Sequence, residues 1–351
     1  MSRLFSHAIR GLVVVTAMSA VTWTAFAAPP DRVEASIRRG LDFIARGQNE
    51  SGTFDSVPAR NFAGIPALCG MAFLAAGDTP MSEPNGPVIM RIVDHLLEKA
   101  RDDGYMGVGN GKMYSHCIST LFLSEISGMV DTNRQEKIAA LLPKAVKIIL
   151  SAQAIKKNGS HDGGWRYEPN SNDSDMSCTG WAVMALRSAR LNGAPVPQEA
   201  IDRAVKFILA HNDARQGTFG YQDTRQYHEN LTGAGLLCLE LCGRHGTPET
   251  QQAGRFLAAN FRRFANGSRK LYGLYYTAQG LFQIGGDAWQ DFSGWMYDYW
   301  IPKQAADGRW DVGEDGCPYY QTALVVLAFT VPYRQLPIYQ RDETVDAEPE
   351  E

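Results

Sequence analysis

The sequence predicts an all-α fold in which six helical hairpins form a double ring. One pattern recurs along the chain: an amphipathic helix, a turn with glycine beside an aromatic residue, a polar loop and a second, more apolar helix. Apolar residues in the first helices recur at i, i+3, i+4 and i+7, which predicts one buried stripe. The second helices are apolar on most faces, so we place them at the centre, inside the first helices. An open solenoid of helix pairs is the alternative, but it would need a solvated concave face.

The six units follow one another in order, and no stretch has the period-2 alternation of a strand. Each unit has a first helix that is more polar, a turn with an aromatic residue, and a second helix that is more apolar. We expect them at 32–48, Phe54 and 66–77; 87–100, Tyr105 and 116–128; 143–153, Trp165 and 177–193; 199–212, Phe219 and 230–243; 250–264, Tyr272 and 276–286; and 291–304, Trp310 and 319–329.

The N-terminal 27 residues have the pattern of a signal peptide. Arg3 and Arg10 precede an apolar run at 11–23, and Ala-Phe-Ala at 25–27 is a small-x-small cleavage site. We therefore expect export, to a periplasm or to the medium, with no transmembrane segment left after cleavage. An uncleaved N-terminal anchor is the alternative, because the apolar run is barely long enough to span a bilayer.

The remaining chain divides into one large domain and a short tail. Residues 28–335 carry the six units, whereas 336–351 are acidic and lack an apolar period, so we expect them to be disordered. The net charge is −4 without a basic run, which argues against a nucleic-acid partner. None of the six cysteines forms a C-x-x-C pair, so we expect most of them to be buried as small apolar side chains.

Two turns resemble a known repeat. QAADGRW (304–310) is similar to the Gln-x-x-x-Gly-x-Trp end of the "QW" repeat of squalene and oxidosqualene cyclases, and RGLDFIARGQNESGTF (39–54) is similar to its longer form. Gln153 and Trp165 fit it with a longer gap. Over about 31–335 the chain therefore resembles the prenyltransferase and squalene-hopene cyclase repeat family. That resemblance implies an α6/α6 toroid, in which the glutamine amide caps a neighbouring helix end and the aromatic covers its apolar flank.

In such a ring the N-termini of the inner helices gather around one mouth, which suits anions and acids. Four residues before the inner-helix threonines at 120, 179 and 232, on which the units can be aligned, lie His116, Asp175 and His228, with Asp173 nearby. These four are our candidate catalytic residues. The alternative interpretation is N-capping by the aspartates and a solvated histidine at a helix start.

The cyclase resemblance implies an Asp-x-Asp-Asp-Thr motif whose central acid protonates the substrate. Here the register aligned on Thr179 reads Asp175-Met176-Ser177-Cys178-Thr179, so the acid pair is missing. A frame beginning at Asp173 recovers two acids but loses the threonine. Neither a hydroxyl nor a thiol can protonate an alkene. We therefore do not expect cyclisation by this route.

Zinc is the one cofactor that the sequence suggests. The resemblance to protein prenyltransferase β-subunits implies a site built from an Asp-Gly-Cys stretch and a histidine, here Asp315, Cys317 and His116. These ligand types suit Zn²⁺. However, unit one intervenes between the two halves of the site, and the alternative is a capping aspartate beside an unrelated cysteine.

Other exported toroids are polysaccharide lyases and glycosidases, which need paired carboxylates or His and Tyr bases in an aromatic cleft. Trp165, Tyr221 and Trp310 are our candidates for substrate-binding aromatics. Because the acid pair is lost from an otherwise intact scaffold, the leading hypothesis is a toroid that binds an apolar or terpenoid molecule, or a protein partner. The alternative is an enzyme at the same mouth acting on a terpenoid, polyprenyl or glycan substrate.

Overall fold

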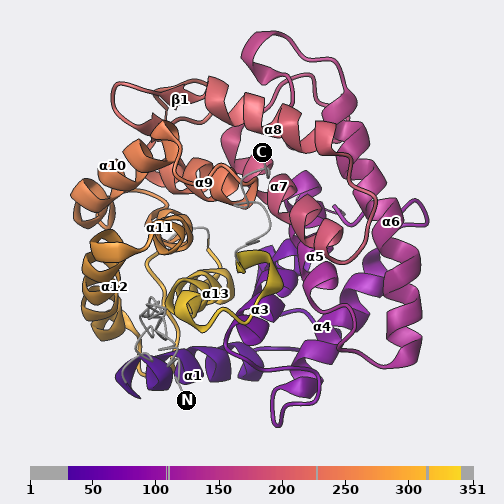
Figure 1. Ribbon diagram of the computed structural model, residues 1–351. Coiled ribbons are helices and arrows are strands. Elements are labelled where there is room, and N and C mark those ends of the chain that lie inside the picture. The colour runs from indigo at the N-terminus through magenta and orange to yellow at the C-terminus, as the bar shows by residue number, and fades with distance from the viewer. Residues whose placement is uncertain (1–30, 108, 110, 227, 314–315, 341–351) are drawn as a thin grey trace, which may run out of the picture.

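The computed structural model describes residues 31–340 apart from 108, 110, 227 and 314–315, and its helices lie in two nested layers (Figure 1). The predicted signal peptide and residues 341–351 lie outside the described residues. The outer helices are α1 (Asp31–Arg46), α4 (Gly86–Lys99), α6 (Thr132–Ala154), α8 (Gln198–Ala210), α10 (Pro248–Phe264) and α12 (Gly286–Trp300). The inner helices are α3 (Gly64–Ala75), α5 (Lys112–Glu125), α7 (Met176–Leu191), α9 (His228–Leu241), α11 (Lys270–Ile284) and α13 (Pro318–Phe329).

The inner helices form a closed circuit. Each packs against the next in chain order, and α13 packs back against α3 (Figure 1). Helices α9 and α11 approach each other closely: a Cβ on Gly233 would lie 2.7 Å from the backbone nitrogen of Thr277. The prediction of a closed helical toroid rather than an open solenoid therefore agrees with these contacts. None of the described helices combines the length and the apolar character that a membrane span requires.

The outer helices bury one stripe each, as their sequence period predicts. In α1 the buried residues include Val33, Ile37, Leu41 and Ile44, on the side that packs against α13. Burial of each such side chain contributes about 1.5–3 kcal/mol. The six cysteines are all free thiols, and five of them are buried, which agrees with their expected role as small core residues.

Three glutamines near the ends of outer helices join each of these helices to the next one. Their Nε2 atoms donate to a carbonyl oxygen early in the next outer helix: Gln48 to Val88 at 3.0 Å, Gln153 to Ala200 at 2.8 Å and Gln304 to Ser36 at 2.9 Å. An arginine of that helix donates back to the amide oxygen: Arg91 at 2.7 Å, Arg203 at 2.8 Å and Arg39 at 2.6 Å. The amides thus cross-link helices instead of capping their ends, and Gln304 ties α12 back to α1.

Several elements differ from the prediction. Helix α6 begins at Thr132 rather than at 143, because Asp131 caps it by accepting a hydrogen bond from the Arg134 N–H. Tyr272 lies inside α11 instead of in a turn; its neighbour Gly273 serves a close helix contact, since a Cβ there would lie 2.8 Å from Asn230 Oδ1. Short strands also flank one turn as a hairpin, β1 (Asn212–Asp213) and β2 (Thr218–Phe219). The remaining short elements are α2 (Val57–Asn61) and the 3₁₀ turns η1 (Gly159–His161), η2 (Ile301–Lys303), η3 (Val331–Tyr333) and η4 (Pro337–Tyr339).

The packed chain extends to residue 340, so the expected start of the tail at 336 is too early. Ile338 and Tyr339 are buried, and η4 packs against α7. The Ile338 N–H donates to Glu125 Oε2 at 3.2 Å, and the hydroxyls of Tyr339 and Tyr275 share a hydrogen bond. This segment therefore packs against the inner helices at the end of the ring where α5 ends.

The carboxyl of Glu125 makes stability depend on pH. Its side chain is 2% exposed, its other oxygen accepts a hydrogen bond from Ser188, and burial raises its pKa to about 7. Between pH 4.5 and about 7 the unfolded chain releases a proton that the folded chain keeps, so the free energy of unfolding falls as pH rises. We expect this term to approach about 3 kcal/mol.

Glu125→Gln removes the titration. Its amide oxygen can accept from the Ile338 N–H while its amide N–H donates to the Ser188 hydroxyl, which reverses the direction of that second hydrogen bond. We expect urea unfolding at pH 5 and pH 8 to show the loss of this titration. The free energy of unfolding of the variant should rise relative to that of the wild type as pH rises. Comparing the two proteins cancels the contribution of other groups, such as His116, whose pKa burial lowers to about 4. A difference between them that is the same at both pH values would contradict this prediction.

Candidate functional site

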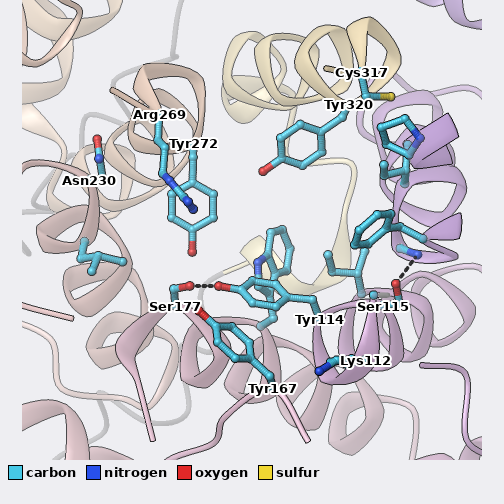
Figure 2. Close-up of a pocket in the computed structure, with 18 of the residues that line it drawn as sticks. Lys112, Tyr114, Ser115, Tyr167, Ser177, Asn230, Arg269, Tyr272, Cys317 and Tyr320 are labelled. Atoms are coloured by element: carbon cyan, nitrogen blue, oxygen red, sulfur yellow. Dashed lines mark hydrogen bonds between the residues drawn. The ribbon is translucent and has the colours of Figure 1, made fainter. Parts of the chain in front are cut away.

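A cavity of about 760 Å³ opens where the inner helices begin (Figure 2). Every inner helix contributes residues from its first turns: Gly64 and Ile65 from α3, Tyr114 and Ser115 from α5, Ser177 from α7, Asn230 and Leu231 from α9, Tyr272 from α11, and Tyr320 from α13. Small-molecule sites commonly enclose about 300–1,000 Å³. The mouth predicted from the repeat is therefore a cavity of the size of a small ligand.

Aromatic rings and hydroxyl groups dominate the wall. The lining aromatics are Phe62, Tyr114, Tyr167, Trp181, Tyr221, Tyr272 and Tyr320, and the aliphatic side chains among them are Ile65, Ile118 and Leu231 (Figure 2). Such rings offer large apolar faces, whereas the phenol oxygens offer a few polar contacts. This composition suits an apolar or aromatic ligand that carries some polar groups.

The phenols of the wall are hydrogen-bonded to one another and to their neighbours. The hydroxyl of Tyr114 bonds to that of Ser177, and the hydroxyl of Tyr167 bonds to that of Tyr221 (Figure 2 shows the first pair). Arg166 Nη1 donates to the Tyr221 oxygen at 2.6 Å. Burial is the main cause that raises the pKa of both Tyr114 and Tyr221. These phenols therefore stay neutral near pH 7 and act as hydrogen-bonding groups rather than as bases.

The charged groups of the described lining are both cations. Lys112 is the first residue of α5, and Arg269 precedes α11; Figure 2 shows them on opposite sides of the cavity. Lys112 forms an ion pair with Glu168 at 2.7 Å, outside the lining. Within the described lining there is no aspartate, glutamate or histidine. The wall can therefore bind and orient a ligand, but none of its described residues is a carboxylic acid that could donate a proton.

Asp175 is a helix cap behind this wall. Its side chain is 0% exposed, Oδ1 accepts from the Cys178 N–H at 2.8 Å, and Oδ2 accepts from Arg166 Nη1 at 2.7 Å. Burial raises its pKa, and the two hydrogen bonds oppose that rise. Asp173 lies 3.2 Å from Arg166 Nε and accepts from Gln222 at 3.0 Å. Arg166 thus brings the two predicted acids together. They hold Arg166, which donates to Tyr221 of the wall, and they do not themselves line the cavity.

The two predicted histidines do not join these acids. Met106 N–H donates to Nδ1 of His116 at 3.1 Å, and Nε2 of His116 lies 3.0 Å from the Ala145 carbonyl oxygen, so both ring nitrogens are used by backbone groups. His228 begins α9 and contacts the Arg225 carbonyl oxygen at 3.2 Å. His116 is a buried link between a turn and α6, and its catalytic role stays a prediction. Neither histidine lines the cavity.

The three proposed zinc ligands are not assembled by the described residues. Cys317 lines the cavity, with its Sγ atom 3.4 Å from Ser56 Oγ. In His116 both ring nitrogens contact backbone groups. Asp315 lies outside the described residues. Within residues 31–340, excluding the masked positions, no group of three or more His, Cys, Asp or Glu side chains is placed to hold a metal ion.

Of the three predicted substrate-binding aromatics, Tyr221 lies in the cavity and the two tryptophans do not. Trp165 and Trp310 are buried, and their indole N–H groups donate to the carbonyl oxygens of Ile149 at 2.7 Å and Trp300 at 2.8 Å. Both rings pack in the turns of the repeat. Neither tryptophan is among the described residues that line this cavity, and their binding of a substrate stays a prediction.

The two lining cations were missed, although the sequence carries a signal for them. Lys112 lies eight residues before Thr120, and Arg269 lies eight residues before Thr277. Extending the threonine alignment to Thr277 places the two cations at equivalent positions of units two and five. The lining tyrosines carry no comparable signal, because their direction depends on the packing of helices distant in sequence.

Comparison with known proteins supports the fold. No family model and no curated protein matches the chain at the sequence level. A type II terpene cyclase, MstE from Scytonema, in complex with geranylgeranyl dihydroxybenzoate, superposes with a TM-score of 0.57 and 14% identity, covering 87% of this chain and 98% of that one. The GH76A α-1,6-mannanase of Salegentibacter sp. HEL1_6 superposes with a TM-score of 0.62 and 12% identity, covering 85% and 98%. The chain therefore has a terpenoid cyclase-like α/α toroid fold.

Proposed function

From this shared toroid fold, we propose that the chain binds a small, largely apolar molecule in the cavity at the starts of the inner helices, without protonating it. The observation that carries the proposal is the wall itself, which is rich in aromatic rings and neutral phenols but has no carboxylate among its described residues. A ligand in such a cavity gains from burial of its apolar surface and is oriented by a few hydroxyl contacts.

The position of Asp175 supports binding rather than cyclisation. Both of its carboxylate oxygens are already used, by the Cys178 N–H and by Arg166, and Arg166 also donates to Tyr221, which is part of the cavity wall. The neighbouring cyclase is known in complex with geranylgeranyl dihydroxybenzoate, which supports an isoprenoid-sized ligand for a cavity of about 760 Å³. We propose a terpenoid or a similar apolar molecule as the ligand class.

The proposal also includes the finer architecture and the location. We propose that the chain is an α6/α6 toroid of six hairpins whose glutamine links at Gln48, Gln153 and Gln304 are QW-type repeats. The signal-like segment at 1–27 supports export to a periplasm or to the medium. A rim that presents the cavity to a protein partner is compatible with this role.

The alternative is an enzyme at the same mouth that acts on a terpenoid or on a glycan. Neighbours of both kinds, a terpene cyclase and a mannanase, favour this alternative. Catalysis of either kind needs a carboxylic acid within reach of the ligand. Asp175 is the acid that the sequence places in register with the cyclase motif, and it is bonded through Arg166 to the lining residue Tyr221. Its replacement therefore distinguishes the two functions.

Retinol, an apolar polyene with one hydroxyl, is a suitable binding probe. Purified protein should bind it with quenching of tryptophan fluorescence, and because Trp181 lines the cavity, Trp181→Phe should lose most of that quenching. Trp289→Phe, which replaces a buried tryptophan of α12 away from the lining, is the matched control and should keep it.

Product assays complete the test. We expect no cyclised product from geranylgeraniol and no new reducing ends from α-1,6-mannan with the wild type, and unchanged retinol affinity in Asp175→Asn. A product formed by the wild type and lost in Asp175→Asn would instead establish the enzymatic alternative. Absence of retinol binding at any concentration would count against the binding function.

A further inference from the structure

We propose that residues 334–340 form a strap that closes the end of the ring opposite the cavity, and that ionisation of Glu125 releases this strap. The segment follows η3 and includes η4. Helix α5 runs between the two places: its first residue, Lys112, lines the cavity, whereas its last residue, Glu125, contacts the strap. The strap therefore covers the ring at the end where the cavity does not open.

The strap is attached to the ring near its tip. The Ile338 N–H donates to Glu125 Oε2 at 3.2 Å, and Gln283 Nε2 of α11 donates to the Tyr339 carbonyl oxygen at 3.2 Å. Ile338 and Tyr339 are buried, whereas the residues at both ends of the strap are exposed. A short segment with exposed ends can open while the rest of the ring stays folded, because local opening costs less free energy than global unfolding.

Tyr339 connects the strap to the floor of the cavity. Its hydroxyl bonds to that of Tyr275, and the Tyr275 ring stacks on Trp181 with centroids 5.7 Å apart and planes 9° apart. Trp181 in turn lines the cavity. Release of the strap would therefore withdraw Tyr339 from the ring and expose Tyr275, the side chain on which the cavity floor rests.

Glu125 is placed to control this attachment, because its carboxyl is buried where no cation compensates its charge. The side chain is 2% exposed and burial raises its pKa to about 7, opposed only by the hydrogen bonds from Ser188 and Ile338. An ionised carboxylate in such surroundings is unfavourable until water reaches it. Movement of Ile338 away from Oε2 opens that oxygen to water, so ionisation favours the released strap.

The neighbouring groups of α11 and of the strap do not titrate near neutral pH. The phenols of Tyr275 and Tyr339 lie near Glu125, and burial raises the pKa of both, so they stay neutral. The strap also carries Arg334, whose guanidinium lies over the Phe282 ring at 5.1 Å from its centroid. Neither element therefore adds a second titration to that of Glu125 in this pH range.

The helices packed against α5 are α3, α6 and α7. Helix α7 presents Ser188 to Glu125, and its Arg187 donates to the Leu241 carbonyl oxygen at the end of α9. Helix α3 contains no acidic or basic residue. The lysines and the glutamate of α6 are exposed, and its Arg134 forms ion pairs with two aspartates. The pH dependence of the strap should therefore reflect Glu125.

Hydrogen exchange followed by mass spectrometry measures the opening of the strap. In the wild type, the opening equilibrium constant of residues 334–340 should rise about tenfold per pH unit above pH 4.5 and level off near pH 7. In Glu125→Gln this constant should not change with pH. Dividing the wild-type exchange rate by that of the variant removes the intrinsic pH dependence of exchange, and this ratio should rise more than about tenfold from pH 5 to pH 7.

Two controls separate release of the strap from other events. Glu98→Gln removes the same charge from an α4 side chain that is 77% exposed, and it should leave the wild-type pH dependence unchanged. Amides of the buried helix α13 report global unfolding and should exchange much more slowly than the strap at each pH. A ratio that is constant from pH 5 to pH 7, or a strap that exchanges no faster than α13, would overturn the proposal.

Two further variants test the titration and the attachment separately. Ser188→Ala removes a hydrogen bond that lowers the pKa of Glu125, so the rise in exchange should extend to higher pH before it levels off. Tyr339→Phe removes the bond to Tyr275 and should speed strap exchange several-fold at pH 5 and at pH 7 alike. A pH profile unaltered by Ser188→Ala, or abolished by Tyr339→Phe, would show that Glu125 does not control the strap.

Discussion

Gly163→Ala is expected to remove most of the stability of the toroid, with a loss of more than about 4 kcal/mol in the free energy of unfolding. Gly163 lies in a turn with a φ of 88°, and a Cβ there would lie 2.2 Å from the Arg203 carbonyl oxygen of the next outer helix. The left-handed conformation alone costs a non-glycine residue about 1–2 kcal/mol. The collision adds more, because the obstacle is backbone and Arg203 also bonds to Gln153.

Gly193→Ala separates the two causes. Gly193 has a φ of 83°, but a Cβ there would meet no atom within 4 Å. This variant should therefore show the conformational cost alone, about 1 kcal/mol. Urea unfolding followed by circular dichroism gives both values. Equal losses in the two alanine variants would show that contact with the next outer helix does not control the turn.

The repeat was predictable because its signals are local. Helical periodicity and the glycine-aromatic turn are read within about 15 residues of sequence. The threonine used to align the units also has a physical role: Thr179, Thr232 and Thr322 accept a hydrogen bond from the backbone N–H of the turn aromatic, each at 3.1 Å. Errors arose where the local signal served another purpose. The glycine beside Tyr272 marks a close helix contact rather than a turn.

The site was less predictable, because a titratable residue at a helix start has two possible roles. Asp175 and His116 were placed correctly near inner-helix starts, but the sequence does not show that backbone groups already occupy Asp175 Oδ1 and both nitrogens of His116. Which residues face the cavity depends on packing between helices far apart in the chain. The hydroxyls of Tyr114 and Ser177, for example, meet across 63 residues of sequence.

Arg166→Met is expected to cost about 3–5 kcal/mol, because it leaves a buried carboxylate without its cationic partner. Asp175 is 0% exposed and would keep only the Cys178 N–H as a hydrogen-bond donor among these contacts. The same change removes the Arg166 donor from Tyr221, so the aromatic wall should loosen and retinol should bind more weakly.

The way in which the stability loss of Arg166→Met depends on pH shows whether the buried charge of Asp175 causes that loss. Burial already raises the pKa of Asp175 above 3.8, and loss of Arg166 raises it further. A raised pKa in the folded state means that stability is lost as pH rises through that value, so the deficit of Arg166→Met should be larger at pH 8 than at pH 5. In the double variant Arg166→Met/Asp175→Asn, the amide still accepts from the Cys178 N–H and carries no charge. Urea unfolding should therefore show most of the loss recovered, whereas additive losses would mean that Arg166 stabilises the fold through contacts other than Asp175.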